Sequence, residues 1–386
     1  MGLKIYFIQM TVIGHIKQVK QYLRELNLNS YKKYTLVTIA FLIGMILFHV
    51  FTWHTISKKV LLVDDYIYNG DLVRSSFKVD SLFPRPSHLV KNVNDLPKQH
   101  LLYKDLKDNE TVDVITIGDS FSNGATQGKN TFYQDYIATY NNYKVLNIPP
   151  GIGYYKGVVR LNNSGLLDEL KPKAIIIESV ERFCIDRFSG NKNLNQTYSK
   201  NSLKKVLRSQ KNMYLGKDPF ISFINNQNAR AFYFNVKMKF KPYTRYKACV
   251  IKPMKKDFFT SKDPNSLLYH KESAMFSYKA TEENIKKLND NFNKLAILLK
   301  KKNIQLYFMP VVDKSNLYRK YVIEPDYPES MFFENLRKMK KEYILIDTKK
   351  ILSKELEKGT KDLYYSDDTH WGYKASKAIF KEVKFE

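Results

Sequence analysis

Two short segments carry residue types that could act together as a nucleophile and its base. Residues 118–121 read GDSF, and residues 366–372, close to the C-terminus, read SDDTHWG. A serine hydroxyl attacks a carbonyl carbon effectively when a base removes its proton, and histidine is the base available near neutral pH. A carboxylate then orients the imidazole and stabilises its charged form. The two segments therefore predict acyl chemistry at Ser120, with His370 as base and Asp367 or Asp368 as acid.

Neither segment is specific by itself, because a Gly-Asp-Ser tripeptide occurs by chance in loops and a lone histidine is usually structural or solvated. The combination is more informative. The other histidines after residue 53 have no acidic residue two or three positions before them; they are His54, His88, His100 and His270. The pattern therefore favours His370 as the base, and two unrelated loop segments remain the alternative.

The elements that must position these residues alternate between strands and helices. Apolar, β-branched runs predict strands over residues 112–118, 144–148, 174–180, 304–311 and 343–346, and helices are expected over 131–140, 155–170, 281–301 and 330–341. This alternation indicates an α/β fold with a parallel sheet covered on both faces. In such sheets the active site lies beyond the carboxyl ends of the strands. Ser120 directly follows the first expected strand and His370 follows the last, so both are expected at that edge.

The two motifs resemble those of the SGNH (GDSL-type) hydrolase superfamily, over residues 110–180 and 280–386. The resemblance implies a three-layer α/β/α sandwich with a Ser-His-Asp triad. The Asp-Thr-His-Trp form, with tryptophan directly after the histidine, is similar to the membrane-linked polysaccharide O-acetyltransferase branch, which includes alginate and cell-wall-glycan acetyltransferases. The run IESVER at 177–182 is also similar to a Glu-Arg pattern of that branch.

The resemblance implies roles for individual residues. Ser120 matches the nucleophile and His370 the base. The acid is ambiguous, since the spacing Asp-x-x-His selects Asp367 and the form Asp-x-His-Trp selects Asp368; the second is favoured. The oxyanion hole would use the Ser120 N–H and Gly151, which follows the second strand.

The third motif departs from the superfamily. Glu181-Arg182 stands where Gly-x-Asn-Asp would be expected, so the oxyanion hole lacks its asparagine donor. Arg182 and Trp371 are candidates for substrate binding. For Arg182, an ion pair with Glu178 or Glu181 is an equally good expectation. No metal ion or cofactor is implied.

A membrane anchor precedes the α/β region. Residues 34–53 (YTLVTIAFLIGMILFHVFTW) carry no formal charge, and at about 1.5 Å per residue they span a bilayer core of roughly 30 Å. Residues 1–33 hold six Lys or Arg and one Glu, so the positive-inside rule places the N-terminus in the cytoplasm. We therefore expect a cytoplasmic segment 1–33, a transmembrane helix 34–53, a lead-in 54–109 and an extracytoplasmic catalytic domain 110–386. A cleaved signal peptide is the less favoured alternative.

The charge of the chain is strongly basic and unevenly distributed. The net charge is +26, and residues 185–279, an insertion expected between the third and fourth strands, hold 20 Lys or Arg and 5 Asp or Glu. No nucleic-acid-binding motif accompanies this charge, so nucleic acid is not an expected partner. The insertion suits an anionic polymer, and a compositionally biased cap with no binding role is an equal alternative. The two cysteines, Cys184 and Cys249, lack metal-binding spacing, and two unpaired thiols are favoured over a disulfide.

Three classes of function follow from these features. In the first, Ser120 accepts an acetyl group and passes it to an envelope or exported polysaccharide, anionic or neutral; a separate multispanning membrane protein must then supply the acyl group. In the second, water replaces the sugar and the protein is an esterase. In the third, the domain is a non-catalytic subunit of a polysaccharide assembly complex. The anchor favours the first.

Overall fold

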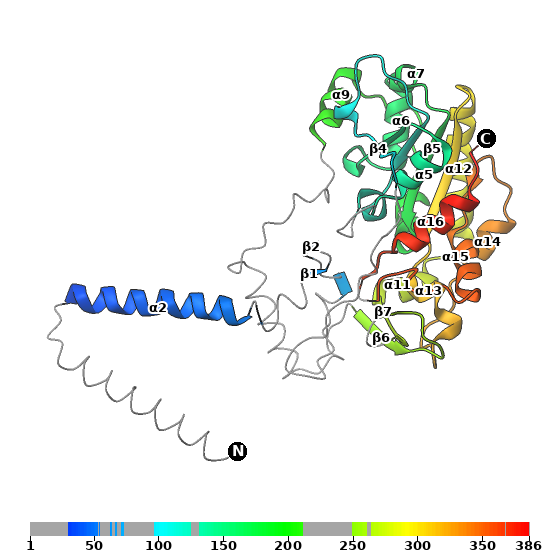
Figure 1. Cartoon of the computed structure of the whole chain (residues 1–386). Coiled ribbons are helices and arrows are strands. Elements are labelled where there is room, and N and C mark those ends of the chain that lie inside the picture. Colours follow the sequence, from blue (N-terminus) through cyan, green and yellow to red (C-terminus); the bar gives the residue numbers. More distant parts are fainter. Residues whose placement is uncertain are drawn as a thin grey trace.

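The computed structural model describes residues 30–52, 54, 62–63, 66–67, 71–72, 96–124, 131–210, 249–260, 264–366 and 368–385. Its centre is a five-stranded, wholly parallel sheet with the order β4-β3-β5-β8-β9 (Figure 1). The strands are β3 (Val114–Ile117), β4 (Val145–Ile148), β5 (Ala174–Val180), β8 (Gln305–Val311) and β9 (Ile344–Leu345). The five strands expected from the sequence are confirmed, with ends that differ by two residues at most.

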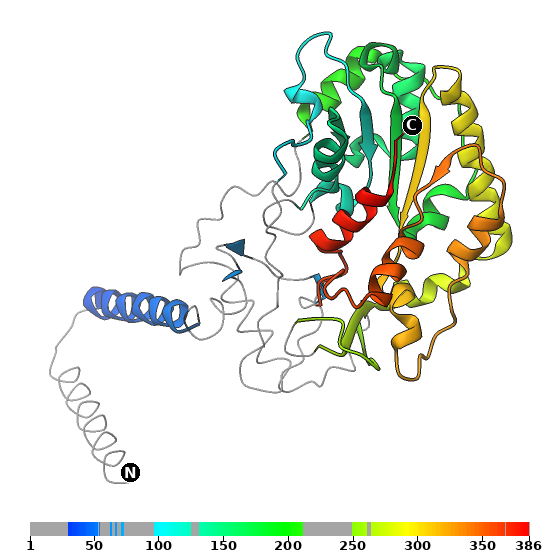
Figure 2. The ribbon, with the colours of Figure 1, turned by 45° about the vertical axis from the view of Figure 1, so that its right-hand side comes forward.

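Helices cover the sheet on both faces (Figure 2). Successive side chains of a strand point to opposite faces, and in β8 the ring of Tyr307 contacts Phe385 whereas the ring of Phe308 stacks on Phe292 of α12. Phe385 follows α16, so α16 and α12 lie on opposite sides. One layer contains α5 (Tyr133–Asn141), α15 (Thr348–Glu357) and α16 (Tyr373–Glu382); the other contains α6 (Tyr155–Asn163), α8 (Glu181–Phe188), α12 (Glu282–Lys300) and α14 (Phe332–Lys338).

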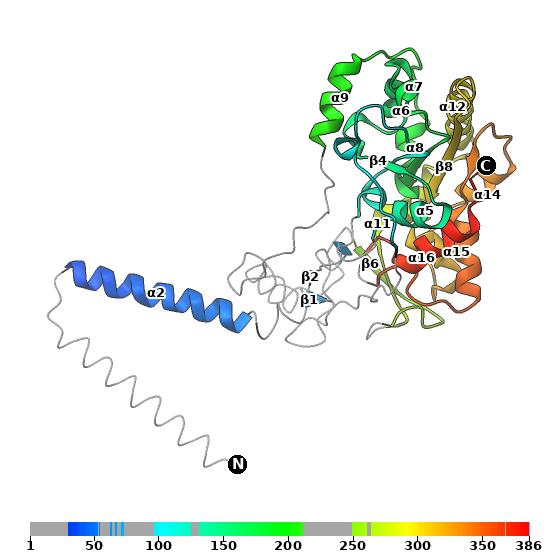
Figure 3. The same ribbon diagram turned by 45° about the horizontal axis from the view of Figure 1, so that its top comes forward.

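Local sequence explains where these helices begin and end. The Thr281 hydroxyl accepts a hydrogen bond from the amide of Asn284 and caps α12, close to the start expected at 281. The helix expected over 155–170 is wrong as one element: it divides into α6 and α7 (Leu166–Leu170), because Gly165 between them adopts a left-handed φ of 75°. The contact of α5 with α16 brings the segment after the first strand against the end of the chain (Figure 3).

The insertion lies between β5 and β8, the third and fourth strands of the sheet, as expected. Its described part contains α9 (Lys200–Ser209), an antiparallel hairpin of β6 (Cys249–Pro253) and β7 (Ser266–His270), and α11 (Lys271–Met275). Its expected start at 185 falls inside α8, which runs directly on from β5. Several of its lysines form ion pairs with acids outside it, so part of its basic charge holds it on the domain; the pairs are Lys200 and Lys204 with Glu169, and Lys252 with Asp326.

Among the described residues, one helix, α2 (Ser30–Thr52), is long and apolar enough to cross a membrane. Its mean hydropathy is 2.2, and nearly all of its side chains are exposed to the surroundings rather than packed in the protein. The expected anchor at 34–53 is confirmed as an apolar helix of this kind. A two-stranded ribbon, β1 (Leu62–Val63) and β2 (Tyr66–Ile67), follows it.

Candidate active site

The turn after β3 presents Ser120 at the carboxyl end of the sheet. Ser120 begins the short 3₁₀-helix η3 (Ser120–Asn123), and the Asp119 carboxylate caps it by accepting from the amide of Phe121. Gly118 makes the turn possible because no side chain fits there. A Cβ at this position would lie 1.9 Å from the Ser122 hydroxyl and 2.1 Å from Oε2 of Glu178.

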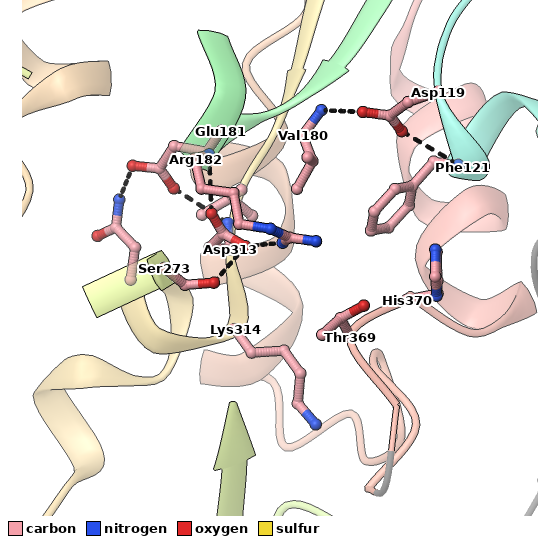
Figure 4. Close-up of polar contacts among 12 residues, drawn as sticks. Asp119, Phe121, Val180, Glu181, Arg182, Ser273, Asp313, Lys314, Thr369 and His370 are labelled. Carbon is pink, nitrogen blue, oxygen red and sulfur yellow. Dashed lines mark hydrogen bonds and ion pairs between the residues drawn. The ribbon is translucent and has the colours of Figure 1, made fainter. Parts of the chain in front are cut away.

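Two buried carboxyl groups, Asp119 and Glu178, hold this turn, and their pKa values are shifted in opposite directions. Burial raises the pKa of Asp119, but the Arg187 guanidinium 2.5 Å away and the amide of Val180 outweigh it, so the pKa of Asp119 is lowered. Figure 4 shows the contact of Asp119 with Val180. The charge of Arg187 lowers the pKa of Glu178 too, but there it is outweighed. Burial and the charge of Asp119 raise its pKa well above the usual value. Oε2 of Glu178 accepts from the Asp119 amide at 2.9 Å and from the Ser122 hydroxyl at 2.7 Å.

Glu178→Gln is expected to stabilise the protein increasingly as the pH rises. The native Glu178 carboxyl keeps its proton above pH 4.5, where the unfolded chain releases it. Each proton so retained costs up to about 1.4 kcal/mol per pH unit, and glutamine removes this cost. Chemical unfolding followed by fluorescence should show a larger gain at pH 8 than at pH 5. Glu169→Gln is the control, because salt bridges to lysines lower the pKa of Glu169. A gain for Glu178→Gln that does not change with pH would contradict the assignment of a neutral Glu178.

The structure brings Ser120, His370 and Asp368 into one hydrogen-bonded chain. The Ser120 hydroxyl lies 2.6 Å from Nε2 of His370. Nδ1 of His370 lies 2.5 Å from Oδ1 of Asp368, which also accepts from the His370 amide at 2.8 Å. Asp367, the other candidate acid, lies outside the described residues. The contacts meet the requirements for a nucleophile, a base and an orienting acid.

The charges around His370 favour its protonated form. Burial lowers the pKa of His370, but the charge of Asp368 and the hydrogen bond to it raise the pKa above its usual value. Asp71 acts in the same direction, and Arg182 opposes it. The imidazole is thus suited to hold a proton taken from a neighbouring hydroxyl such as that of Ser120.

A buried lysine holds the loop that carries His370. Lys314, in α13 (Lys314–Leu317) just after β8, donates from Nζ to the backbone carbonyls of Tyr365, Ser366 and Asp368, at 2.7, 3.2 and 3.0 Å. The three hydrogens of an ammonium group match three such acceptors. Lys314 therefore attaches the loop to the end of β8. The neighbouring strand is β5, which leads into α8.

Arg182 forms its ion pair with a residue that the sequence reading did not consider. Its Nη1 lies 2.5 Å from Oδ1 of Asp313, and its amide donates to Oδ2 at 2.9 Å. The expected alternative, a pair with Glu178 or Glu181, is wrong. Glu178 instead bonds the turn after β3, and Glu181 accepts from Asn316, Ser330 and the Asp313 amide. The Arg182 guanidinium points toward the side of the site where His370 and Thr369 lie (Figure 4).

The other two expected site residues lie at the same edge of the sheet. Gly151 is exposed in η4 (Pro150–Ile152), directly after β4, which neighbours β3. Its role as an oxyanion donor stays a prediction. Trp371 is 4% exposed, and its ring packs edge-on against Phe121 at 5.1 Å between centroids. Trp371 therefore supports the histidine loop from within the core and offers a substrate little surface.

Asp71 also lies at the site, and the sequence reading did not identify it. Its Oδ2 lies 3.8 Å from Nδ1 of His370, and its amide donates to Oδ2 of Asp368. No motif marks Asp71, which lies almost 300 positions from these partners. Asp313 could have been found, because it lies two residues after an expected strand, at the edge of the sheet where the site lies.

The same three residues, Asp71, Asp368 and His370, could in principle hold a metal ion. Two atoms bound to one tetrahedral zinc ion lie roughly 3.3 Å apart. Nδ1 of His370 and Oδ1 of Asp368 are 2.5 Å apart and bonded to each other, so the arrangement fits a triad better than a metal centre.

Of the two cysteines, Cys184 is a free, buried thiol, and the side chain of Cys249 lies outside the description.

Comparison with known proteins gave no relatives: no family model, no curated protein and no solved structure matches this chain. The function is therefore argued from the geometry of the site.

Proposed function

We propose that this protein is a membrane-anchored serine O-acyltransferase that transfers acetyl groups to an envelope or exported polysaccharide. The observation that carries the proposal is the chain of contacts from Ser120 through His370 to Asp368, at 2.6 and 2.5 Å. The resemblance of GDSF and DDTHWG to the SGNH superfamily, and to its polysaccharide O-acetyltransferase branch, supports the same reading.

The first half of the proposed reaction forms an ester on the enzyme. Nε2 of His370 takes the proton of the Ser120 hydroxyl as Oγ attacks the acetyl carbonyl carbon. The carbonyl oxygen becomes an oxyanion, for which the Ser120 amide and Gly151 are the proposed donors. The tetrahedral intermediate then collapses, the bond to the leaving group breaks, and His370 donates the proton to that group. Asp368 stabilises the imidazolium throughout.

In the second half, a sugar hydroxyl takes the place of water. His370 removes its proton, the sugar oxygen attacks the acetyl-serine, and Ser120 recovers its proton as the sugar ester leaves. Arg182, whose guanidinium points toward the site, is the proposed contact for the acceptor. Trp371 is too buried to share that role.

The apolar helix α2 supports placing the reaction at a membrane. In this proposal residues 1–33 are cytoplasmic and the α/β domain is extracytoplasmic, in keeping with the basic residues before the helix. One helix provides no path for an acetyl donor across a bilayer. A multispanning membrane protein is therefore the proposed partner that supplies the acyl group.

An assay with the full-length protein in detergent tests transfer directly. With p-nitrophenyl acetate as donor and neutral or anionic oligosaccharides as acceptors, we expect acetylated sugar by mass spectrometry, and acetate release that falls as the acceptor concentration rises. Ser120→Ala should remove both products. Acetate alone at every acceptor concentration would reject transfer and leave an esterase. Neither product, with no acetyl-enzyme at Ser120, would reject catalysis altogether.

A further inference from the structure

We propose that Asp71, from the lead-in between the membrane helix and the α/β domain, is a positioning residue of the triad, so that the site is complete only when the lead-in is docked on the domain. The inference rests on the proposed function, since it concerns the same triad. Asp71 lies 19 residues after Thr52, the last residue of α2, and 43 residues before the start of β3 at Val114.

Asp71 bonds the two residues that directly precede His370. Its amide donates to Oδ2 of Asp368 at 2.9 Å. Its Oδ1 accepts from the amide of Thr369 at 2.8 Å, and its Oδ2 accepts from the Thr369 hydroxyl. A backbone donor and both carboxylate oxygens of one residue are thus committed to the histidine loop.

These contacts restrict the acid of the triad. Oδ1 of Asp368 accepts from the backbone amide and from Nδ1 of His370, and Oδ2 of Asp368 accepts from the amide of Asp71. With both oxygens bonded from fixed directions, the carboxylate cannot rotate away from the imidazole. Asp368 is 3% exposed, so water does not readily replace a lost partner.

The histidine loop is held from two sides by groups of opposite charge. The ammonium of Lys314, from the end of β8, bonds the carbonyls of Tyr365, Ser366 and Asp368, while the Asp71 carboxylate bonds Thr369. Lys314 belongs to the α/β domain itself, whereas Asp71 comes from outside it. Of these two sets of contacts, the one made by Lys314 belongs to the domain, and the one made by Asp71 depends on how the lead-in folds.

Asp71 also acts on His370 through its charge. The groups that face the imidazole are Asp368 on its own loop, Asp71 on the lead-in and Arg182 on α8, and the Lys314 ammonium lies behind the loop. Asp71 and Asp368 favour the imidazolium and Arg182 disfavours it. Burial, and then the neighbouring Asp368, raise the pKa of Asp71 itself, as expected for two adjacent carboxylates.

The position of Asp71 in the chain ties the active site to the membrane. Nineteen residues extend over at most roughly 65 Å, so Ser120 and His370 stay within about that reach of the end of α2. An acyl group handed over at the membrane surface would thus meet a triad that is complete only in the anchored, docked chain.

The test uses the full-length protein in detergent and measures the rate at which a fluorophosphonate labels Ser120 between pH 5 and 9. Asp71→Asn keeps the backbone donor and removes the charge. We expect the maximal rate to fall by about 10- to 100-fold, and the pH midpoint, which follows the pKa of His370, to fall by about half a unit to one unit. Asp71→Ala should lower the rate further.

One further variant and one control separate positioning from general damage. Leu72→Ala removes a fully buried neighbour of Asp71, so it weakens docking of the lead-in and should lower both the rate and the pH midpoint, as Asp71→Asn does. Asp108→Asn alters an exposed acid of the same lead-in and should change neither rate nor midpoint. Circular dichroism gives the folded fraction to which each rate is normalised.

The outcomes distinguish this inference from the proposed function. Wild-type rate and midpoint in both folded Asp71 variants would overturn the role of Asp71, as would a midpoint shift of equal size in Asp108→Asn. No labelling of the wild type at Ser120 would overturn the inference and the triad together. Labelling that depends on Asp71, in a protein that transfers no acetyl group to sugar, would support the inference and reject the acceptor.

Discussion

Ser120→Ala should lower acyl turnover by on the order of 10⁶-fold, the loss typical of removing the nucleophile of a Ser-His-Asp triad. The variant lacks the atom that forms the ester, and no hydroxyl remains within reach of Nε2 of His370 among the contacts described. Release of p-nitrophenol from the acetate ester measures the loss, and mass spectrometry shows whether an acetyl group remains on the protein.

The fold should survive this substitution, because the Ser120 side chain is half-buried at the end of a strand and its one described hydrogen bond is the one to His370. The free energy of unfolding should change by less than about 1 kcal/mol. Ser209→Ala, at an exposed serine at the end of α9, is the matched control and should keep full turnover. Persistent labelling or acetylation of the Ser120→Ala protein would place the nucleophile elsewhere.

Asp368→Asn should lower turnover by about 10⁴-fold while leaving the protein folded. An asparagine amide in place of Oδ1 would donate toward Nδ1 and favour the tautomer that carries its proton on Nε2, which cannot accept the proton of Ser120. The turnover that remains should rise with pH about a lower midpoint than in the wild type. The sign follows from Asp368, whose charge and hydrogen bond raise the pKa of His370; their loss lowers it.

Asp367→Asn is the comparison that resolves the acid. The two aspartates are adjacent in sequence and both fit a known spacing to His370, but the contact of 2.5 Å is made by Asp368. We expect Asp367→Asn to keep most of the turnover. A large loss in Asp367→Asn with little loss in Asp368→Asn would reverse the assignment, and full turnover in both would remove the triad.

Local patterns were enough to predict the sheet. The strand at 174–180 opens with a continuous apolar run, residues 174–177, because both faces of a parallel sheet are buried. The α12 stripe of Ile285, Leu288 and Phe292 repeats at helical spacing because one face meets the sheet. The rule that sites lie at the carboxyl ends of strands then predicted that Ser120 and His370 lie close together.

The same reasoning failed where a residue acts through a distant partner. The expected partners of Arg182 were Glu178 and Glu181, which lie four positions and one position before it. Its partner is Asp313, which lies 131 positions along the chain, at the end of the neighbouring strand β8. Glu178 is one of two polar residues at the end of an otherwise apolar strand, and nothing local shows that it bonds the turn after β3. Trp371 matched a motif, yet its burial against Phe121 depends on how two loops meet.

The sequence by itself determined the α/β class, the apolar helix and the two segments that carry the triad, because periodicity, hydropathy and strand-end position are properties of neighbouring residues. Only the tertiary structure decided that Asp368 is the acid within bonding distance, that Lys314 holds the histidine loop and that Asp71 reaches the site. Those contacts join segments up to 298 positions apart. Hydrogen bonds require atoms within about 3 Å in a set direction, and only the packed chain creates that proximity.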